Sequence, residues 1–169
     1  MAVPHAVAVT PLHYRGIVDA RAERVIEMFE KRGEVEAIQS GGKVAARASL
    51  ERARQHLEAA ELLVDAGKWE PAFTTAYDAY RMAAESIVVA LGYRVPAVKG
   101  AHRITADIAN AALGNSTVFT AASAEQFRSG RHDAEYFDPD RPVEKTEADA
   151  RWAVDLAQRA VTEVESGLD

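Results

Sequence analysis

The sequence predicts an all-α protein: an antiparallel up-and-down bundle of four to five helices with an extra N-terminal helix. Apolar residues recur at helical spacing in several segments, and runs of alternating β-branched residues are missing. Hydrophobic residues make up 48% of the chain but aromatic ones only 7%, so small side chains supply much of the core, as in closely packed helices. The length of 169 residues fits one compact domain with a short appendage.

The N-terminal part of the chain predicts one amphipathic helix over 17–31, which ends near Gly33. Its apolar stripe consists of Val18, Ala22, Val25 and Phe29. Residues 34–43 contain a Ser-Gly-Gly sequence, which is typical of a flexible joint. We therefore expect 1–43 to form an N-terminal extension, with a helix and a glycine-containing linker, and 44–169 to form the helical bundle.

The strongest periodicity predicts a helical hairpin at the start of this bundle. A heptad-like stripe over 45–66 ends at Gly67, where a left-handed cap costs least, and the second helix covers 70–91, with Pro71 in its first turn. The stripe of the first helix is Leu50, Ala53, Leu57, Ala60 and Val64. So short a connection forces the two helices to be antiparallel.

The rest of the chain predicts three more helices, separated by glycine and proline. They cover 102–113, 117–136 and the residues from about 147 to 166. Asn115 or Ser116 is the expected cap of the second, in which Gly130 is a weak point. Thr146 and Asp149 resemble a capping box at the start of the third, with Asp in place of Glu.

Composition limits the function classes. The chain has 20 Lys and Arg against 26 Asp and Glu, a net charge of −6, which argues against a globally basic, nonspecific nucleic-acid binder. The absence of cysteine excludes disulfides, thiolate zinc sites and cysteine nucleophiles. Without a secretory pattern in 1–14 and with no aliphatic run longer than 87–91, we expect a cytoplasmic protein that does not enter a membrane.

Metal and nucleotide motifs are missing from the sequence. A di-iron bundle would carry Glu-x-x-His pairs, and no carboxylate stands three residues before His56, His102 or His132. The Gly41-Gly42-Lys43 sequence lacks the glycine spacing of a phosphate loop. We expect no metal and no cofactor.

Positive charge is concentrated locally in two segments. Residues 94–106 contain Arg94, Lys99, His102 and Arg103 and no acid; residues 128–132 contain Arg128, Arg131 and His132. If their helices pack together, these segments form a positive pocket in which guanidinium groups bind a phosphate. The candidate phosphate ligands are Arg128, Arg131, Lys99, His102 and Arg103. Solvated helix ends explain the same pattern about equally well.

The second basic segment also contains the candidate catalytic residues, Arg131, His132 and Tyr136. Arg128 and His132 are four residues apart and share a face if Gly130 does not break the helix, so that the imidazole could transfer a proton while the arginine holds a phosphate. Tyr136, taken alone, is better explained as a core aromatic residue.

Two parts of the chain are similar to a known family. Residues 50–63, the turn Gly67-Lys68-Trp69 and residues 76–80 look like a helix, a Gly-aromatic turn and an Ala-Tyr-rich helix, and 128–136 looks like an Arg-containing segment before a last helix. In this order they resemble the HEPN superfamily, over about 48–166. The resemblance implies a small all-helical fold, a homodimer, and RNA cleavage by an arginine followed, after four to six residues, by a histidine.

The sequence departs from that motif. The residue four intervening positions after Arg131 is Tyr136, and His132 stands directly beside the arginine. A tyrosine hydroxyl is a poor base at neutral pH. The resemblance thus favours a dimeric protein that binds nucleotide or RNA phosphate through Arg128, Arg131 and His132 without efficient catalysis.

Two alternatives remain open. One is a metal-independent, toxin-like ribonuclease that uses Arg131 and His132. The other is a non-catalytic protein–protein interaction module whose helix over 17–31 docks onto a partner or onto the sister subunit.

Overall fold

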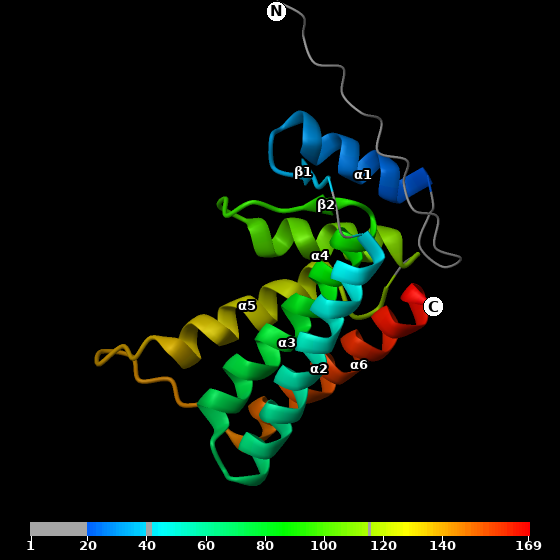
Figure 1. Ribbon diagram of the computed structural model, residues 1–169. Coiled ribbons are helices and arrows are strands. Elements are labelled where there is room, and N and C mark those ends of the chain that lie inside the picture. The colour runs from blue at the N-terminus through cyan, green and yellow to red at the C-terminus, as the bar shows by residue number, and fades with distance from the viewer. Residues whose placement is uncertain (1–19, 40–41, 115) are drawn as a thin grey trace, which may run out of the picture.

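The computed structural model describes residues 20–39, 42–114 and 116–169. Within these ranges the chain forms six helices and two very short strands, so the predicted all-α bundle is confirmed (Figure 1). The elements are α1 (Ala20–Lys31), β1 (Glu36–Ala37), α2 (Gly42–Asp65), α3 (Trp69–Ala90), β2 (Tyr93–Arg94), α4 (Ala101–Ala112), α5 (Ala121–Glu135) and α6 (Glu147–Leu168).

Helix α3 is the centre of the bundle. It packs against α2, α6, α4 and α5, and most of its faces are therefore buried. Alanine at many of its buried positions lets neighbouring helices come close. The turn to α2 is made at Gly67, whose φ of 68° lies in the left-handed region that favours glycine, so the predicted hairpin and its cap are confirmed.

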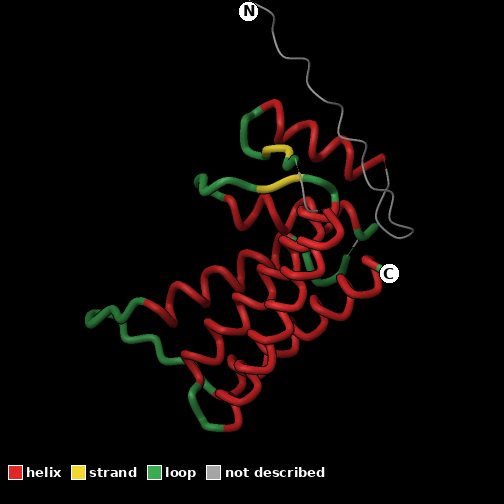
Figure 2. The backbone as a smooth tube through the Cα atoms, in the orientation of Figure 1, coloured by secondary structure: helices red, strands yellow, loops and turns green. Residues whose placement is uncertain are grey.

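Helix α1, the two strands and α4 gather at one end of the bundle, as Figures 1 and 2 show. Ala22, Ile26 and Phe29 of α1 are buried in the same core as the bundle, and α1 packs on α4. The apolar face that the sequence offered to a partner is therefore covered by the chain's own α4. Val18 of the predicted stripe lies outside the described residues, and the division at residue 43 stays a prediction.

The strands correct the expectation that the chain has none. Glu36 pairs with Arg94 and Ala37 with Tyr93 in antiparallel register, and the Arg94 guanidinium lies 2.6 Å from a Glu36 carboxylate oxygen. Two residues are too few to show an alternating pattern, so periodicity could not reveal this pair. Helix α2 begins at Gly42, which shortens the expected linker; Ser40 and Gly41 lie outside the described residues.

Helix α5 starts later than expected. Its N-cap is Thr120, whose side chain accepts a backbone N–H from the first turn, whereas the predicted helix covered 117–136. Ser116, an expected cap, instead accepts backbone N–H bonds within the preceding loop, which buries Phe119 against α3. The other expected cap, Asn115, lies outside the described residues.

Gly130 does not break α5, which is continuous from Ala121 to Glu135. A Cβ atom at Gly130 would lie 2.8 Å from Cε1 of Phe73, so glycine is required for α5 to approach α3. Phe127, fully buried one turn earlier, packs edge-on against Phe73 with ring centroids 5.3 Å apart. The ring of Trp152 from α6 lies 5.3 Å from the Phe127 ring and completes this aromatic core.

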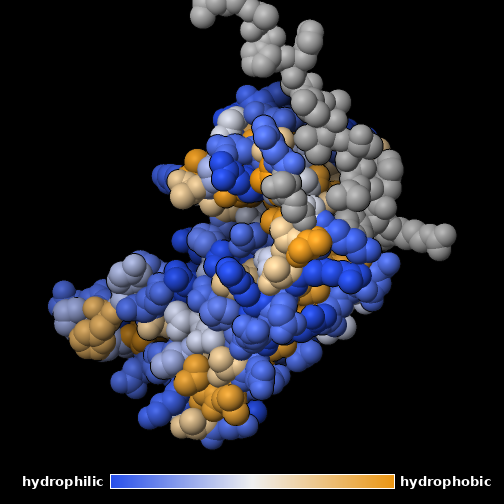
Figure 3. All heavy atoms as spheres, in the orientation of Figure 1, coloured by the Kyte–Doolittle hydropathy of each residue, from blue (hydrophilic) through white to orange (hydrophobic). Residues whose placement is uncertain are grey.

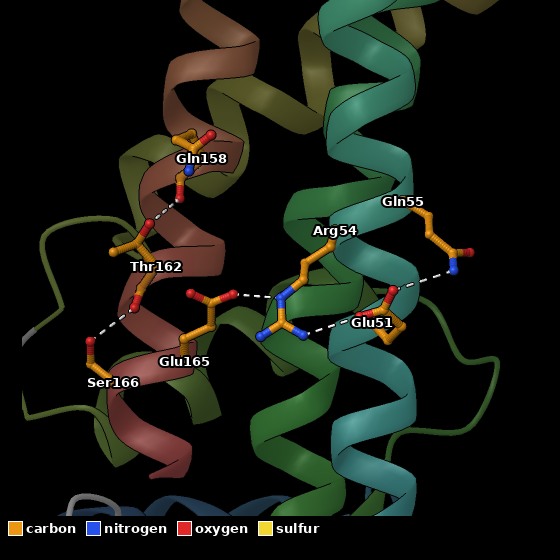
Figure 4. A network of polar contacts seen from close by, with 7 residues as sticks. All are labelled: Glu51, Arg54, Gln55, Gln158, Thr162, Glu165 and Ser166. Carbon is orange, nitrogen blue, oxygen red and sulfur yellow. Dashed lines mark hydrogen bonds and ion pairs between the residues drawn. The ribbon is translucent and has the colours of Figure 1, made fainter.

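The last helix begins as predicted. Thr146 and Asp149 form a reciprocal capping box, in which Asp149 Oδ2 accepts the Thr146 N–H at 2.8 Å. Near its C-terminal end α6 is joined to α2 by an ion pair: Arg54 of α2 bonds Glu165 of α6 and also Glu51 of its own helix (Figure 4). None of the helices in the described ranges combines the length and apolar character needed to cross a bilayer.

Candidate functional site

A cleft of about 330 Å³ opens between α3, α4 and α5. Its size lies at the lower end of the range for small-molecule sites. Aromatic and basic side chains form about half of its lining, and four alanines, Thr105 and Glu125 form the rest. The aromatic and basic residues are Tyr77, Tyr80 and Arg81 from α3, His102 and Arg103 from α4, and Arg128 from α5. This cleft is called the basic cleft below.

The local sequence explains how each helix presents these side chains. Tyr77 and Arg81 are four residues apart on α3 and so share one face. Gly100, with a φ of 86°, starts α4 without a side-chain cap and leaves His102 and Arg103 in the first turn, the end of a helix that favours anions. Because Gly130 allows α5 to lie close to α3, Arg128 reaches the same cleft.

Each arginine that lines the basic cleft is paired with a carboxylate on its own helix. The pairs are Arg81–Glu85 at 3.1 Å, Arg103–Asp107 at 3.7 Å and Arg128–Glu125 at 2.7 Å. The bond to Arg128 lowers the pKa of Glu125, so this carboxylate is ionised at neutral pH. Exposed ion pairs contribute little to stability, and a phosphate that offers bidentate geometry can compete for the guanidinium groups.

His102 is the titratable group of the cleft that changes charge near neutral pH. Burial lowers the pKa of its imidazole, and the positive charges of Arg81 and Arg131 lower this pKa further. The ring lies 5.7 Å from that of Tyr77. His102 is therefore mainly neutral at pH 7, and a bound anion beside it would favour its protonated form.

Arg131 lies next to the cleft rather than in its lining. Its guanidinium is 5.2 Å from the centre of the Tyr77 ring and forms an ion pair with Glu135 at 2.8 Å. Within the described residues its Nε is buried and has no hydrogen-bond partner. Burial raises the pKa of Tyr77, and the charge of Arg131 opposes this rise. Arg131 thus joins α5 to α3 through a cation–π contact.

The two basic segments of the sequence meet in part. His102 and Arg103 from the first and Arg128 from the second line the same cleft, whereas Lys99 is exposed in the loop before α4 and does not line it. The phosphate-binding roles of these residues stay predictions.

The predicted catalytic residues lie at the C-terminal end of α5. Since α5 is unbroken, Arg128 and His132 are on one face, but His132 is exposed and its ring lies 4.8 Å from that of Tyr136 instead of in the cleft. Tyr136 is 64% exposed, so its interpretation as a core residue is wrong. Figure 1 shows that the C-terminal end of α5 projects from the bundle and that the loop after it returns the chain to the start of α6.

Sequence reasoning missed the contribution of α3 to the cleft. The sequence shows Tyr77 and Tyr80 as members of an Ala-Tyr-rich helix segment, but both are buried and line the cleft. Arg81 stands outside both basic segments. The spacing of Tyr77 and Arg81 was the available signal, because a charged residue one turn after a buried aromatic residue marks the edge of the buried face.

The described residues hold no cluster of three or more His, Asp or Glu side chains placed to bind a metal ion. The side chains that line the cleft supply guanidinium, imidazole, phenol, hydroxyl and carboxylate groups, which can bind an anion and exchange a proton.

Comparison with known proteins gives one match. A family model described as the HEPN domain matches residues 46–167, which run from the first turns of α2 to the end of α6 and include every residue that lines the basic cleft. No curated protein and no solved structure matches the chain. Helix α1 and the strand β1 precede the matched residues. The match covers well over half of the chain, and the protein belongs to the HEPN-domain family.

Proposed function

We propose that this protein binds the phosphate of a nucleotide or of RNA in the basic cleft, without efficient catalysis. One observation carries the proposal: three arginines and a histidine from three helices surround one cleft with a tyrosine floor, in a chain of net charge −6. Guanidinium groups bind phosphate oxygens bidentately.

The arrangement of acids and bases favours binding over cleavage. Cleavage of RNA without a metal needs one group that removes the proton of the 2′-hydroxyl and one that protonates the leaving oxygen. The basic cleft contains one imidazole, His102, while the second histidine of this region, His132, lies outside the lining. The cleft also contains one carboxylate, Glu125, but its bond to Arg128 lowers its pKa and makes it a weak base. The phenol of Tyr77 has a raised pKa, so it stays protonated at neutral pH and cannot remove the proton.

The test compares two arginines that have similar exposure and one carboxylate partner each, of which only one lines the cleft. Arg128 lines the cleft and its side chain is 52% exposed; Arg159 lies on α6, is 50% exposed and pairs with Asp155 at 2.9 Å. Arg128→Ala and Arg159→Ala therefore change the net charge equally and each leaves one carboxylate without its arginine.

The measurement is fluorescence anisotropy of an end-labelled, single-stranded RNA octamer, with AMP as a competitor, at low and moderate salt. We expect Arg128→Ala to weaken binding about tenfold or more, because hydrogen bonds between charged groups contribute roughly 1.5–3 kcal/mol. Arg159→Ala should bind like the wild type. Equal losses in both variants, or no saturable binding at low salt, would overturn the proposal.

The same samples also test the ribonuclease alternative. The octamer is incubated with excess protein without metal, and the products are separated on a gel. Intact RNA is the expected result. Fragments that disappear in both Arg131→Ala and His132→Ala would instead assign a metal-independent ribonuclease to the end of α5.

A homodimer and a protein partner stay predictions. Light scattering coupled to size exclusion would measure the mass of the protein in solution, and a monomer at all concentrations would exclude the dimer.

A further inference from the structure

A second cavity adjoins the basic cleft. Its volume is about 260 Å³, and it lies between α3, the strand β2 with the loop that follows it, and the start of α4. Arg81, His102 and Thr105 line both cavities. The two are therefore neighbouring parts of one groove, with these three side chains at the junction.

The adjoining cavity differs from the basic cleft in chemistry. Val88, Val95 and Pro96 give it apolar walls. Three charged side chains also line it, Arg81 at the junction, Glu85 and Arg94, and all are paired: Arg81 with Glu85 and Arg94 with Glu36. An uncharged base and ribose would meet these apolar walls and a few hydrogen-bonding groups here.

The junction between the two cavities favours a negatively charged group of the ligand. Arg81 and His102 line both cavities, and the guanidinium of Arg81 carries five N–H donors. A ligand with nucleosides in the two cavities would place the phosphate that links them against this pair.

Size supports a ligand of two units. Each cavity alone is near or below the lower end of the range of about 300–1,000 Å³ that small-molecule sites occupy. A single nucleotide in the basic cleft would leave the apolar walls of the adjoining cavity uncovered.

We propose that the adjoining cavity is a second subsite and that the ligand consists of at least two nucleotide units, whose internal phosphodiester lies against Arg81 and His102. The proposal rests on the proposed function and goes beyond it, because it fixes the minimal length of the ligand and assigns the cavity beside β2 to its second nucleoside.

The test is a comparison of UMP with the dinucleotide pUpU by isothermal titration calorimetry. Ala97 is exposed in the loop after β2 and lines only the adjoining cavity of the two, so Ala97→Trp should fill this cavity without entering the basic cleft. Ala48→Trp, at an exposed position on α2 that lines neither cavity, is the matched control. Circular dichroism checks that both variants fold.

For the wild type and for Ala48→Trp, we expect pUpU to bind about tenfold or more tightly than UMP. For Ala97→Trp, UMP should bind as before and the gain from the second unit should disappear. Equal affinities for UMP and pUpU would overturn the second subsite and leave the proposed function intact. A gain that persists in Ala97→Trp would also overturn it, and failure of both ligands to bind would refute the proposed function as well.

Discussion

Gly130 provides a sharp test of how α5 is held against α3. In an exposed helix interior, alanine is about 1 kcal/mol more favourable than glycine, so helix propensity alone predicts that Gly130→Ala stabilises the protein. Gly130 is not among the glycines with a positive φ, and its backbone conformation therefore accepts alanine. The structure predicts the opposite result, because the new methyl group would collide with the ring of Phe73.

The size of the effect follows from how little room the Phe73 ring has. Phe73 is 3% exposed, its ring packs against those of Phe127 and Trp152, and the Lys145 ammonium lies 4.7 Å from the ring centre. Overpacking a well-filled core costs about 1–3 kcal/mol, and a ring confined on several sides places this change near the upper end. After the propensity gain, we expect a net loss of about 2 kcal/mol in the free energy of unfolding.

The assay is urea denaturation followed by circular dichroism, with the slope of the transition checked for constancy. Ser129→Ala, at the exposed neighbouring position on the same helix, is the control and should be neutral or slightly stabilising. In the double variant Gly130→Ala, Phe73→Leu, the second change should cost less than it does in the wild type, because it removes the colliding ring. A Gly130→Ala protein at least as stable as the wild type would refute this account of the contact.

Three other changes have distinct expected outcomes. Thr146→Ala should lower the free energy of unfolding by about 1 kcal/mol, as measured by urea denaturation, because it removes the side chain that caps α6. The backbone N–H of Thr146, which this variant keeps, and its hydroxyl both lower the pKa of Asp149, so the stabilisation from these two bonds should be present above the ordinary Asp pKa and be lost as the pH falls through the lowered value. A phosphodiester bound beside His102 should raise the lowered pKa of this imidazole. The affinity for pUpU should therefore increase as the pH is lowered from about 8 to about 5.5. A His102→Gln protein with the same pH profile would contradict this role. Arg54→Ala should cost at most about 1 kcal/mol in thermal or urea unfolding, and a double-mutant cycle with Glu165→Gln should give a coupling energy below about 1 kcal/mol, because both side chains are more than a third exposed.

The hairpin and the last helix could be predicted because their signals are local. A long apolar stripe, a glycine at the turn and a capping box each report on residues within a few positions. The start of α5 could not be predicted in this way: residues 117–120 contain Val118 and Phe119, which are buried from a loop and resemble the beginning of a helix stripe in sequence.

The cleft was predictable only in part, for a related reason. His102 and Arg103 could be predicted because they lie in a segment, 94–106, that contains no acidic residue. Arg128 could be predicted because it lies in the second basic segment. Arg81 lies among the apolar residues of a buried helix, and it joins the cleft only because α4 and α5 both pack on that helix. The contact of these three helices depends on tertiary packing, and no single segment of the sequence carries a signal for it.

The exposed apolar side chains also depend on tertiary packing rather than on a local sequence signal. On the face drawn in Figure 3, apolar residues gather near the turn between α2 and α3 and at the loop after α5, with polar residues over much of the remainder. Leu62, 64% exposed, and Phe137, 82% exposed, are large apolar side chains in these two regions. Sequence periodicity does not identify these two side chains as exposed, because burial depends on which neighbouring elements cover them.

The position of α1 in the chain has a consequence for the order of events during synthesis on the ribosome. Its packing partner α4 follows about 80 residues later, which at about 5–20 residues per second is a delay of roughly 4–16 s. An isolated helix of 12 residues is marginal in water, so α1 should not persist during this interval. Helix α1, the earliest of the described helices, is thus among the last of them to become stably folded, and the nascent chain carries Ile26 and Phe29 uncovered until the middle of the bundle has emerged.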